Sequence, residues 1–94
     1  MTVDGPADAG TNPDRDIAAP AATVDSRGRR CPLPIIDLAR AFASLVPGAT
    51  IALWADDPAA GPDVAAWCRL RGQELVTVRA LPGGGEEFVI RRLA

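Results

Sequence analysis

Two cysteine thiols are the strongest nucleophiles that this sequence of 94 residues offers. Cys31 and Cys68 are its only cysteines, and the chain contains neither histidine nor lysine. Without histidine there is no imidazole base and no Ser-His or Cys-His pair of the kind that hydrolases use. Without lysine there is no Schiff base and no phosphate-binding lysine of the kind found in nucleotide hydrolases. The residue types therefore favour thiol chemistry.

The same residues argue against a resident metal or cofactor. Zinc sites usually need four ligands, and two cysteines separated by 37 positions could complete one only with carboxylates. An iron–sulfur cluster usually needs four thiolates, which this chain cannot supply. We expect no metal site and no bound cofactor.

Charge and length place these thiols in one small domain behind an acidic extension. The net charge is −2, but residues 1–20 alone carry −3, so the remainder is close to neutral. Residues 1–21 are rich in Pro, Gly, Ala and Asp, and we expect them to be disordered, with a folded domain over residues 22–94. No basic field favours stable nucleic-acid binding, and no apolar run approaches the roughly 20 residues that span a bilayer. We expect a cytoplasmic protein with reduced cysteines.

The elements that must position the thiols alternate between strand and helix. Apolar residues recur every three or four positions after Pro32 and Pro34, and the resulting helix should stop at Pro47-Gly48. Pro62 and Asp63 should open a second helix, which Gly72 caps. The predicted strands cover residues 23–24, 49–55, 74–81 and 87–93. This βαβαββ order predicts an α/β two-layer sandwich, with a four-stranded mixed sheet covered on one face by two helices.

Cys31 lies at the start of the first predicted helix. A helix N-terminus favours thiolate over thiol, and Arg29 and Arg30 directly upstream add positive charge. We therefore expect a lowered pKa for Cys31. Pro32 and Pro34 stiffen the first turn and should hold the sulfur outward. On these residues alone, a small apolar cysteine without a chemical role is the alternative interpretation.

The segment around Cys31 resembles a known family. Asp25-Ser26-Arg27-Gly28-Arg29-Arg30-Cys31-Pro32-Leu33-Pro34-Ile35 is similar to the Cys-Pro-x-Pro signature of the TusA/SirA-type sulfur carriers. A second block, Ala55-Asp56-Asp57-Pro58-Ala59 followed by Asp63-Val64 and Trp67-Cys68, is similar to that family's second block, and the resemblance covers residues 23–93.

The resemblance implies a sulfur relay. Cys31 would accept sulfane sulfur from a cysteine desulfurase or rhodanese, hold it as a persulfide, and pass it to an acceptor protein. In the family this serves tRNA 2-thiolation, molybdenum cofactor maturation or sulfur oxidation. Such a protein is a carrier with sulfurtransferase-type chemistry more than a self-contained catalyst. A stabilised thiolate would suit both halves of the exchange.

The sequence departs from the family pattern at the start of the second helix. Ala60 and Gly61 stand where threonines are common, and Pro62 stands where a polar residue is frequent. If those hydroxyls cap the helix, Pro62 and Asp63 compensate in part. The adjacent Asp56-Asp57 pair is interpreted as a solvated turn in preference to a pair of acid–base carboxylates.

Two alternatives to the carrier remain at this point. The first is a thiol redox protein in which Cys68 resolves an oxidised Cys31 as a disulfide. It is disfavoured because Cys68 shares a helix face with Val64 and is expected in the core. The second is a regulatory binding module in which the Cys31 thiol is incidental.

Overall fold

The computed structural model describes residues 20–94. The disorder expected for residues 1–21 lies outside the described residues except at the last two positions. Ala21 already donates its backbone N–H to the Thr50 carbonyl at 2.8 Å. Hydrogen bonding to the sheet therefore starts one residue before the expected domain boundary.

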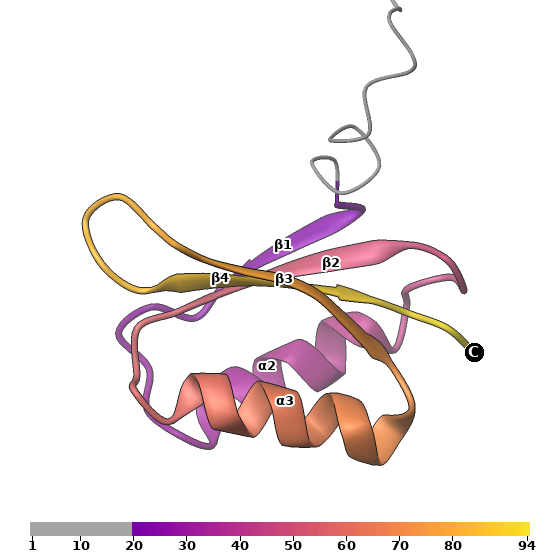
Figure 1. Cartoon of the computed structure of the whole chain (residues 1–94), viewed down its shortest axis with the longest axis horizontal. Coiled ribbons are helices and arrows are strands. Elements are labelled where there is room, and N and C mark those ends of the chain that lie inside the picture. Colours follow the sequence, from indigo (N-terminus) through magenta and orange to yellow (C-terminus); the bar gives the residue numbers. More distant parts are fainter. Residues whose placement is uncertain (1–19) are drawn as a thin grey trace, which may run out of the picture.

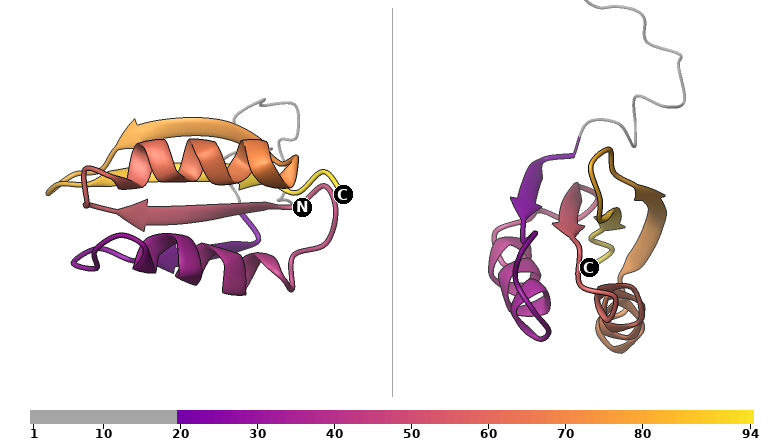
Figure 2. Two further views of the ribbon diagram at one scale, coloured as in Figure 1. Left: turned by 90° about the horizontal axis from the view of Figure 1, so that it is seen from below. Right: turned by 90° about the vertical axis from the view of Figure 1, so that its left-hand side faces the viewer.

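The elements follow the predicted order and form the predicted layers. They are β1 (Ala22–Asp25), α2 (Leu33–Phe42), β2 (Thr50–Ala55), α3 (Ala60–Arg71), β3 (Glu74–Ala80) and β4 (Glu86–Arg91). The strand order is β1-β2-β4-β3, with β1 parallel to β2 and the other two pairings antiparallel. Both helices cover the same face of this mixed sheet (Figures 1 and 2). The two-layer α/β sandwich is confirmed.

The core lies between the helices and the covered face of the sheet. Leu38 of α2 and Val64 of α3 are fully buried against alternate residues of the two central strands. Strand side chains alternate between faces, so one face of each central strand supplies the core. Its members on these strands are Ile51, Leu53, Phe88 and Ile90.

The other face of the sheet carries no helix in the described part of the chain (Figure 1). There, Trp54 donates its indole N–H to Glu87 at 3.0 Å, and the Arg27 guanidinium lies 4.9 Å from the centre of the Trp54 ring. Ala52 lies on this uncovered face, opposite Ile51 and Leu53, yet it is fully buried. Its small side chain is shielded because β2 is a central strand with neighbours on both sides.

Helix α2 ends at Phe42, earlier than the apolar stripe up to Val46 predicts. Arg92 explains the difference, because its guanidinium donates to the carbonyl oxygens of Phe42 at 3.2 Å and Leu45 at 2.7 Å. Carbonyls at a helix end need such partners. Here the partner is the side chain of Arg92, the residue that follows β4, so the helix can end before Pro47.

Helix α3 begins at Ala60, earlier than the predicted opening at Pro62–Asp63. Asp57 accepts a hydrogen bond from the Ala59 N–H at 2.9 Å, which satisfies a donor at the start of the helix. The helix ends as predicted at Gly72, whose φ of 68° is left-handed and costs glycine little.

The loop between β3 and β4 rests on the end of β2. A Cβ atom at Gly85 would lie 2.9 Å from the Ala55 carbonyl oxygen and 3.2 Å from Asp56 Cβ. At Gly83 a Cβ atom would meet nothing within 4 Å. The two glycines have similar positive φ angles, 83° at Gly85 and 85° at Gly83. Only the contact of Gly85 with the end of β2 therefore distinguishes them.

We expect Gly85→Ala to lower the free energy of unfolding more than Gly83→Ala. Both variants introduce left-handed strain of about 1 kcal/mol, and Gly85→Ala adds a backbone clash that brings the loss to roughly 3 kcal/mol. Urea denaturation followed by tryptophan fluorescence measures the difference. Equal losses would contradict the close approach at Gly85.

Candidate functional site

Two loops meet at the end of the sheet where β1 and β2 finish. Residues 26–32 connect β1 to α2 and carry Cys31, and residues 56–59 connect β2 to α3. Because β1 and β2 are parallel neighbours, both loops leave the same edge of the sheet and lie side by side (left in Figure 1). The tertiary structure thus brings the Cys-Pro-x-Pro segment next to the Asp56-Asp57 turn.

The acidic turn holds the thiol loop by its backbone. Asp57 accepts a hydrogen bond from the Cys31 N–H at 2.7 Å, and Asp56 accepts one from the Gly28 N–H at 2.9 Å. The other carboxylate oxygen of Asp57 accepts from Ala59. Asp56-Asp57 lies in a turn just before α3, as predicted, and Asp56 is exposed. The parallel strand ends also place both carboxylates against the backbone of the neighbouring loop, a role that the sequence did not predict.

The Cys31 side chain is exposed and contacts the first turn of α3. Its Sγ lies 2.8 Å from Oδ2 of Asp63, and the thiol donates this hydrogen bond to the carboxylate. Asp63 was expected to help open the second helix. Its carboxylate instead points to the sulfur, while Asp57 provides the acceptor at the helix start.

The electrostatic surroundings of Cys31 are acidic, not basic. The hydrogen bond to Asp63, partial desolvation, and the negative charges of Asp63 and Asp57 raise the pKa of the Cys31 thiol above its ordinary value. Each of these effects favours the neutral thiol over the thiolate. The expected lowering of the Cys31 pKa is therefore wrong in direction.

The first turn of α2 has no N–H left to offset these carboxylates. A helix start attracts anions through N–H groups that lack partners. Each of the first positions here is a proline or already has a backbone acceptor: Leu33 donates to Arg30, Pro34 has no N–H, and Ile35 and Ile36 both donate to Pro32. The prolines that shape the loop also remove the donors that were expected to stabilise a thiolate.

The charges of the two arginines that precede Cys31 act on neighbouring carboxylates, and one of the two arginines forms an ion pair. Arg29 forms an ion pair with Asp37 of α2 at 2.8 Å, and Asp37 also accepts a hydrogen bond from the buried Ser26 hydroxyl at 2.6 Å. Arg30 is exposed, and its positive charge helps to lower the pKa of Asp57. Both positive charges were expected to lower the pKa of the Cys31 thiol. In the structure they act on the carboxylates of Asp37 and Asp57.

The two prolines have different positions. Pro34 is fully buried and anchors the start of α2 in the fold, whereas Pro32 is the exposed N-cap residue and follows a cis peptide bond. Cys31 stands directly before them on the surface. A cavity of about 320 Å³ opens beside this loop and is lined by Gly28, Arg29, Arg30, Asp56, Asp57 and Pro58.

Cys68 lies apart from this surface site. It is 4% exposed and belongs to the core cluster, as its helix face predicted. Burial raises the pKa of its thiol. Neither cysteine is in a disulfide. The structure therefore separates one accessible thiol from one enclosed thiol.

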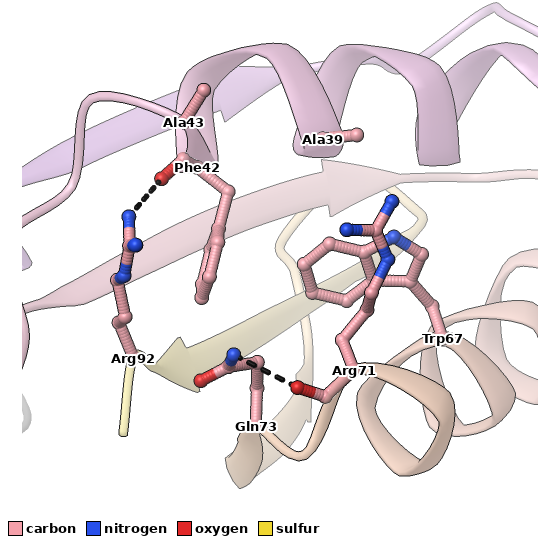
Figure 3. Close-up of a pocket in the computed structure, with 7 residues that line it drawn as sticks. All are labelled: Ala39, Phe42, Ala43, Trp67, Arg71, Gln73 and Arg92. Carbon is pink, nitrogen blue, oxygen red and sulfur yellow. Dashed lines mark hydrogen bonds between the residues drawn. The ribbon is translucent and has the colours of Figure 1, made fainter. Parts of the chain in front are cut away.

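A second cavity, of about 370 Å³, lies between the C-terminal halves of the two helices (Figure 3). The rings of Phe42 and Trp67 meet edge to face there, with centroids 5.0 Å apart. Arg71 lies over the Trp67 ring at 5.7 Å, and Arg92 reaches the Phe42 carbonyl. Among residues 20–94, no thiol or carboxylate lines this cavity. We therefore assign the candidate site to the Cys31 end.

Within residues 20–94, no group of three or more His, Cys, Asp or Glu side chains is arranged to hold a metal ion. No helix within this range is long and apolar enough to cross a membrane.

Two comparisons with known proteins bear on the family and the fold of this chain. The family model described as "Sulfurtransferase TusA" matches residues 22–92. The fold is similar to the crystal structure of a SirA-like protein from Desulfitobacterium hafniense, with a TM-score of 0.69 and 22% identity. That match covers 78% of this chain and 99% of the other.

The carboxylates that organise the two loops should make the fold sensitive to acid. Hydrogen bonds from the Ala59 and Cys31 N–H groups lower the pKa of Asp57, and Arg27 lowers that of Asp25 to about 2. A carboxyl group with a depressed folded pKa stabilises the fold above its unfolded pKa of about 4, and this contribution is lost as pH falls through the folded value. We expect the free energy of unfolding to fall between about pH 4 and pH 2.

Urea denaturation at several pH values tests this expectation. Asp57→Asn keeps the shape of the side chain but cannot carry the charge, so its stability should fall less steeply below about pH 4 than that of the unmodified protein. An identical pH dependence in the two proteins would contradict the role assigned to Asp57.

Proposed function

This chain belongs to the sulfurtransferase TusA family, and on that premise we propose that it carries sulfane sulfur as a persulfide on Cys31 and relays it to an acceptor protein. The observation that carries the proposal is the exposure of the Cys31 thiol on a loop held by Asp56 and Asp57. A carrier must place its sulfur inside a partner's site, and this thiol is accessible for that purpose. Cys68 is not, because it is buried.

Loading and unloading are two thiol exchanges with the same chemistry. In loading, Cys31 Sγ attacks the terminal sulfur of a donor persulfide and forms a new S–S bond. The donor's own S–S bond breaks, its electron pair stays on the donor cysteine sulfur, and that sulfur takes the proton from Cys31. In unloading, an acceptor thiol attacks the terminal sulfur of the Cys31 persulfide. The S–S bond at Cys31 breaks, the terminal sulfur passes to the acceptor, and Cys31 Sγ takes the acceptor's proton and becomes a thiol again. No net oxidation occurs, so no external oxidant is needed.

The donor that we propose is a cysteine desulfurase or a rhodanese, and the acceptor is a downstream protein with a reactive cysteine. tRNA 2-thiolation, molybdenum cofactor maturation and sulfur oxidation are the processes in which such a relay would act, in the cytoplasm. Cys31 itself holds the cargo, so the relay requires no further cofactor.

Residues beside Cys31 would serve docking and presentation. We propose that exposed Arg30, together with Arg29 at the cavity beside the loop, contacts partner proteins. Buried Pro34 and capping Pro32 support the presentation of the sulfur because they restrict the backbone on both sides of the helix start.

We expect incubation with a cysteine desulfurase and cysteine to add sulfur to Cys31. Intact-mass and peptide mass spectrometry should show one additional sulfur atom mapped to this residue. Cys31→Ser should abolish the added mass, because serine cannot form a persulfide. Cys68→Ser is the matched control and should load normally, because its thiol is buried.

Sulfur loading, mild oxidation and partner binding together distinguish the carrier from the rival functions. Sulfur on Cys68 alone, or no added sulfur, would contradict the carrier. A thiol redox protein would instead form a Cys31–Cys68 disulfide under mild oxidation. A binding module with an incidental thiol would keep its partner binding and its biological effect in Cys31→Ser.

A further inference from the structure

In the proposed carrier, carboxylates from α3 and from the β2–α3 loop contact Cys31 or its loop. Asp63 of α3 lies 2.8 Å from Cys31 Sγ, and Asp57 of the β2–α3 loop lies 2.7 Å from the Cys31 backbone nitrogen. Asp56 binds the same loop at Gly28. The thiol's own loop also carries two arginines. Arg29 forms an ion pair with Asp37, and the positive charge of Arg30 helps to lower the pKa of Asp57.

This arrangement opposes the chemistry that a carrier needs. The nucleophile in sulfur exchange is the thiolate. A carboxylate that accepts the thiol hydrogen bond, with a second negative charge nearby, favours the protonated sulfur. The first turn of α2 cannot offset these charges, because its N–H groups already have backbone acceptors or are absent at proline. The free protein therefore holds Cys31 in its less reactive form.

A docked partner can reverse this balance, because the carboxylates are accessible. Asp56 is exposed, and Asp57 and Asp63 are half-buried. A lysine or arginine brought against Asp63 would compete with the thiol for the carboxylate and would favour the thiolate by its charge. Removal of water at the interface would strengthen this effect.

We propose that Asp63 holds the proton on Cys31 in the free carrier and that the sulfur donor activates the thiol by presenting a cationic side chain to Asp63 and Asp57. This inference rests on the proposed sulfur-carrier function. When the cation pairs with Asp63, the hydrogen bond from Sγ breaks. The Cys31 proton then passes to the cysteine sulfur that leaves the donor, and Cys31 forms the new S–S bond. Partner docking and thiol activation thus become one event.

The first test measures the reactivity of the free thiol. Iodoacetamide alkylation of Cys31 is followed by mass spectrometry from pH 6 to pH 10 in the unmodified protein and in Asp63→Asn. The variant should react about three- to tenfold faster at pH 7, with its pH profile moved to lower pH, because more thiolate is present. Glu74→Gln on β3 is the matched charge control and should react like the unmodified protein. An unchanged profile in Asp63→Asn would overturn the inference.

The second test uses charged reagents in place of the donor. A methanethiosulfonate with a trimethylammonium-ethyl group is compared with its sulfonatoethyl counterpart at low salt. The cationic reagent should react with Cys31 faster by about threefold or more relative to the same ratio for a free cysteine derivative. The preference should shrink in Asp63→Asn and in 1 M salt, which screens exposed charges. Equal or inverted preference at Cys31 would overturn the inference.

These results are separable from the fate of the proposed function. None of the three reagents transfers sulfane sulfur, so both tests report only on the electrostatics of Cys31. If a desulfurase loads Cys31 while Asp63→Asn leaves the alkylation profile unchanged, the carrier stands and the role of Asp63 falls. If the profile shifts but Cys31 is never loaded, Asp63 controls the proton of a thiol with another function, and the proposal about the donor falls with the carrier.

Discussion

The carboxylate of Asp57 is the contact on which the geometry of the thiol site depends. One of its oxygens accepts the Cys31 N–H and the other accepts the Ala59 N–H, so a single side chain joins the thiol loop to the start of α3. This bridge is possible because β1 and β2 run parallel and end at the same edge of the sheet. The same bridge brings Asp63, one turn into α3, within hydrogen-bond distance of the sulfur. Position and electrostatics of the thiol therefore have a common origin.

The Asp57 bridge explains why the Cys31 thiol can be exposed and still favour its protonated, less nucleophilic form. Accessibility comes from the loop, which stands outside the two layers. Reactivity depends on charge, and the carboxylates that hold the loop also favour the neutral thiol. For the proposed carrier, a nucleophile that stays weak until a partner docks would limit side reactions, because these follow thiolate character and exposure.

The order of elements and both layers could be predicted from periodicity, prolines and glycines, and the burial of Cys68 followed from its helix face. The end of α2 could not be predicted, because its carbonyls are satisfied by Arg92, a residue about 50 positions away along the chain. The early start of α3 also depends on a neighbour in space, the carboxylate of Asp57. Local patterns describe which residues suit a helix or a strand, whereas the partners at an element's ends come from the rest of the fold.

The sequence by itself predicted a thiol as the reactive group and Cys31 as the candidate, and it determined the small α/β sandwich that carries this residue. Those conclusions depend on residue types and short-range spacing, which do not require coordinates. Only the tertiary structure decided the charge around the sulfur. Arg29 and Arg30 are adjacent to Cys31 in the chain, but Asp57 and Asp63, 26 and 32 positions away, make the hydrogen bonds to it. Electrostatic interactions depend on distance in space, and the parallel pairing of β1 with β2 places the distant acids at the thiol.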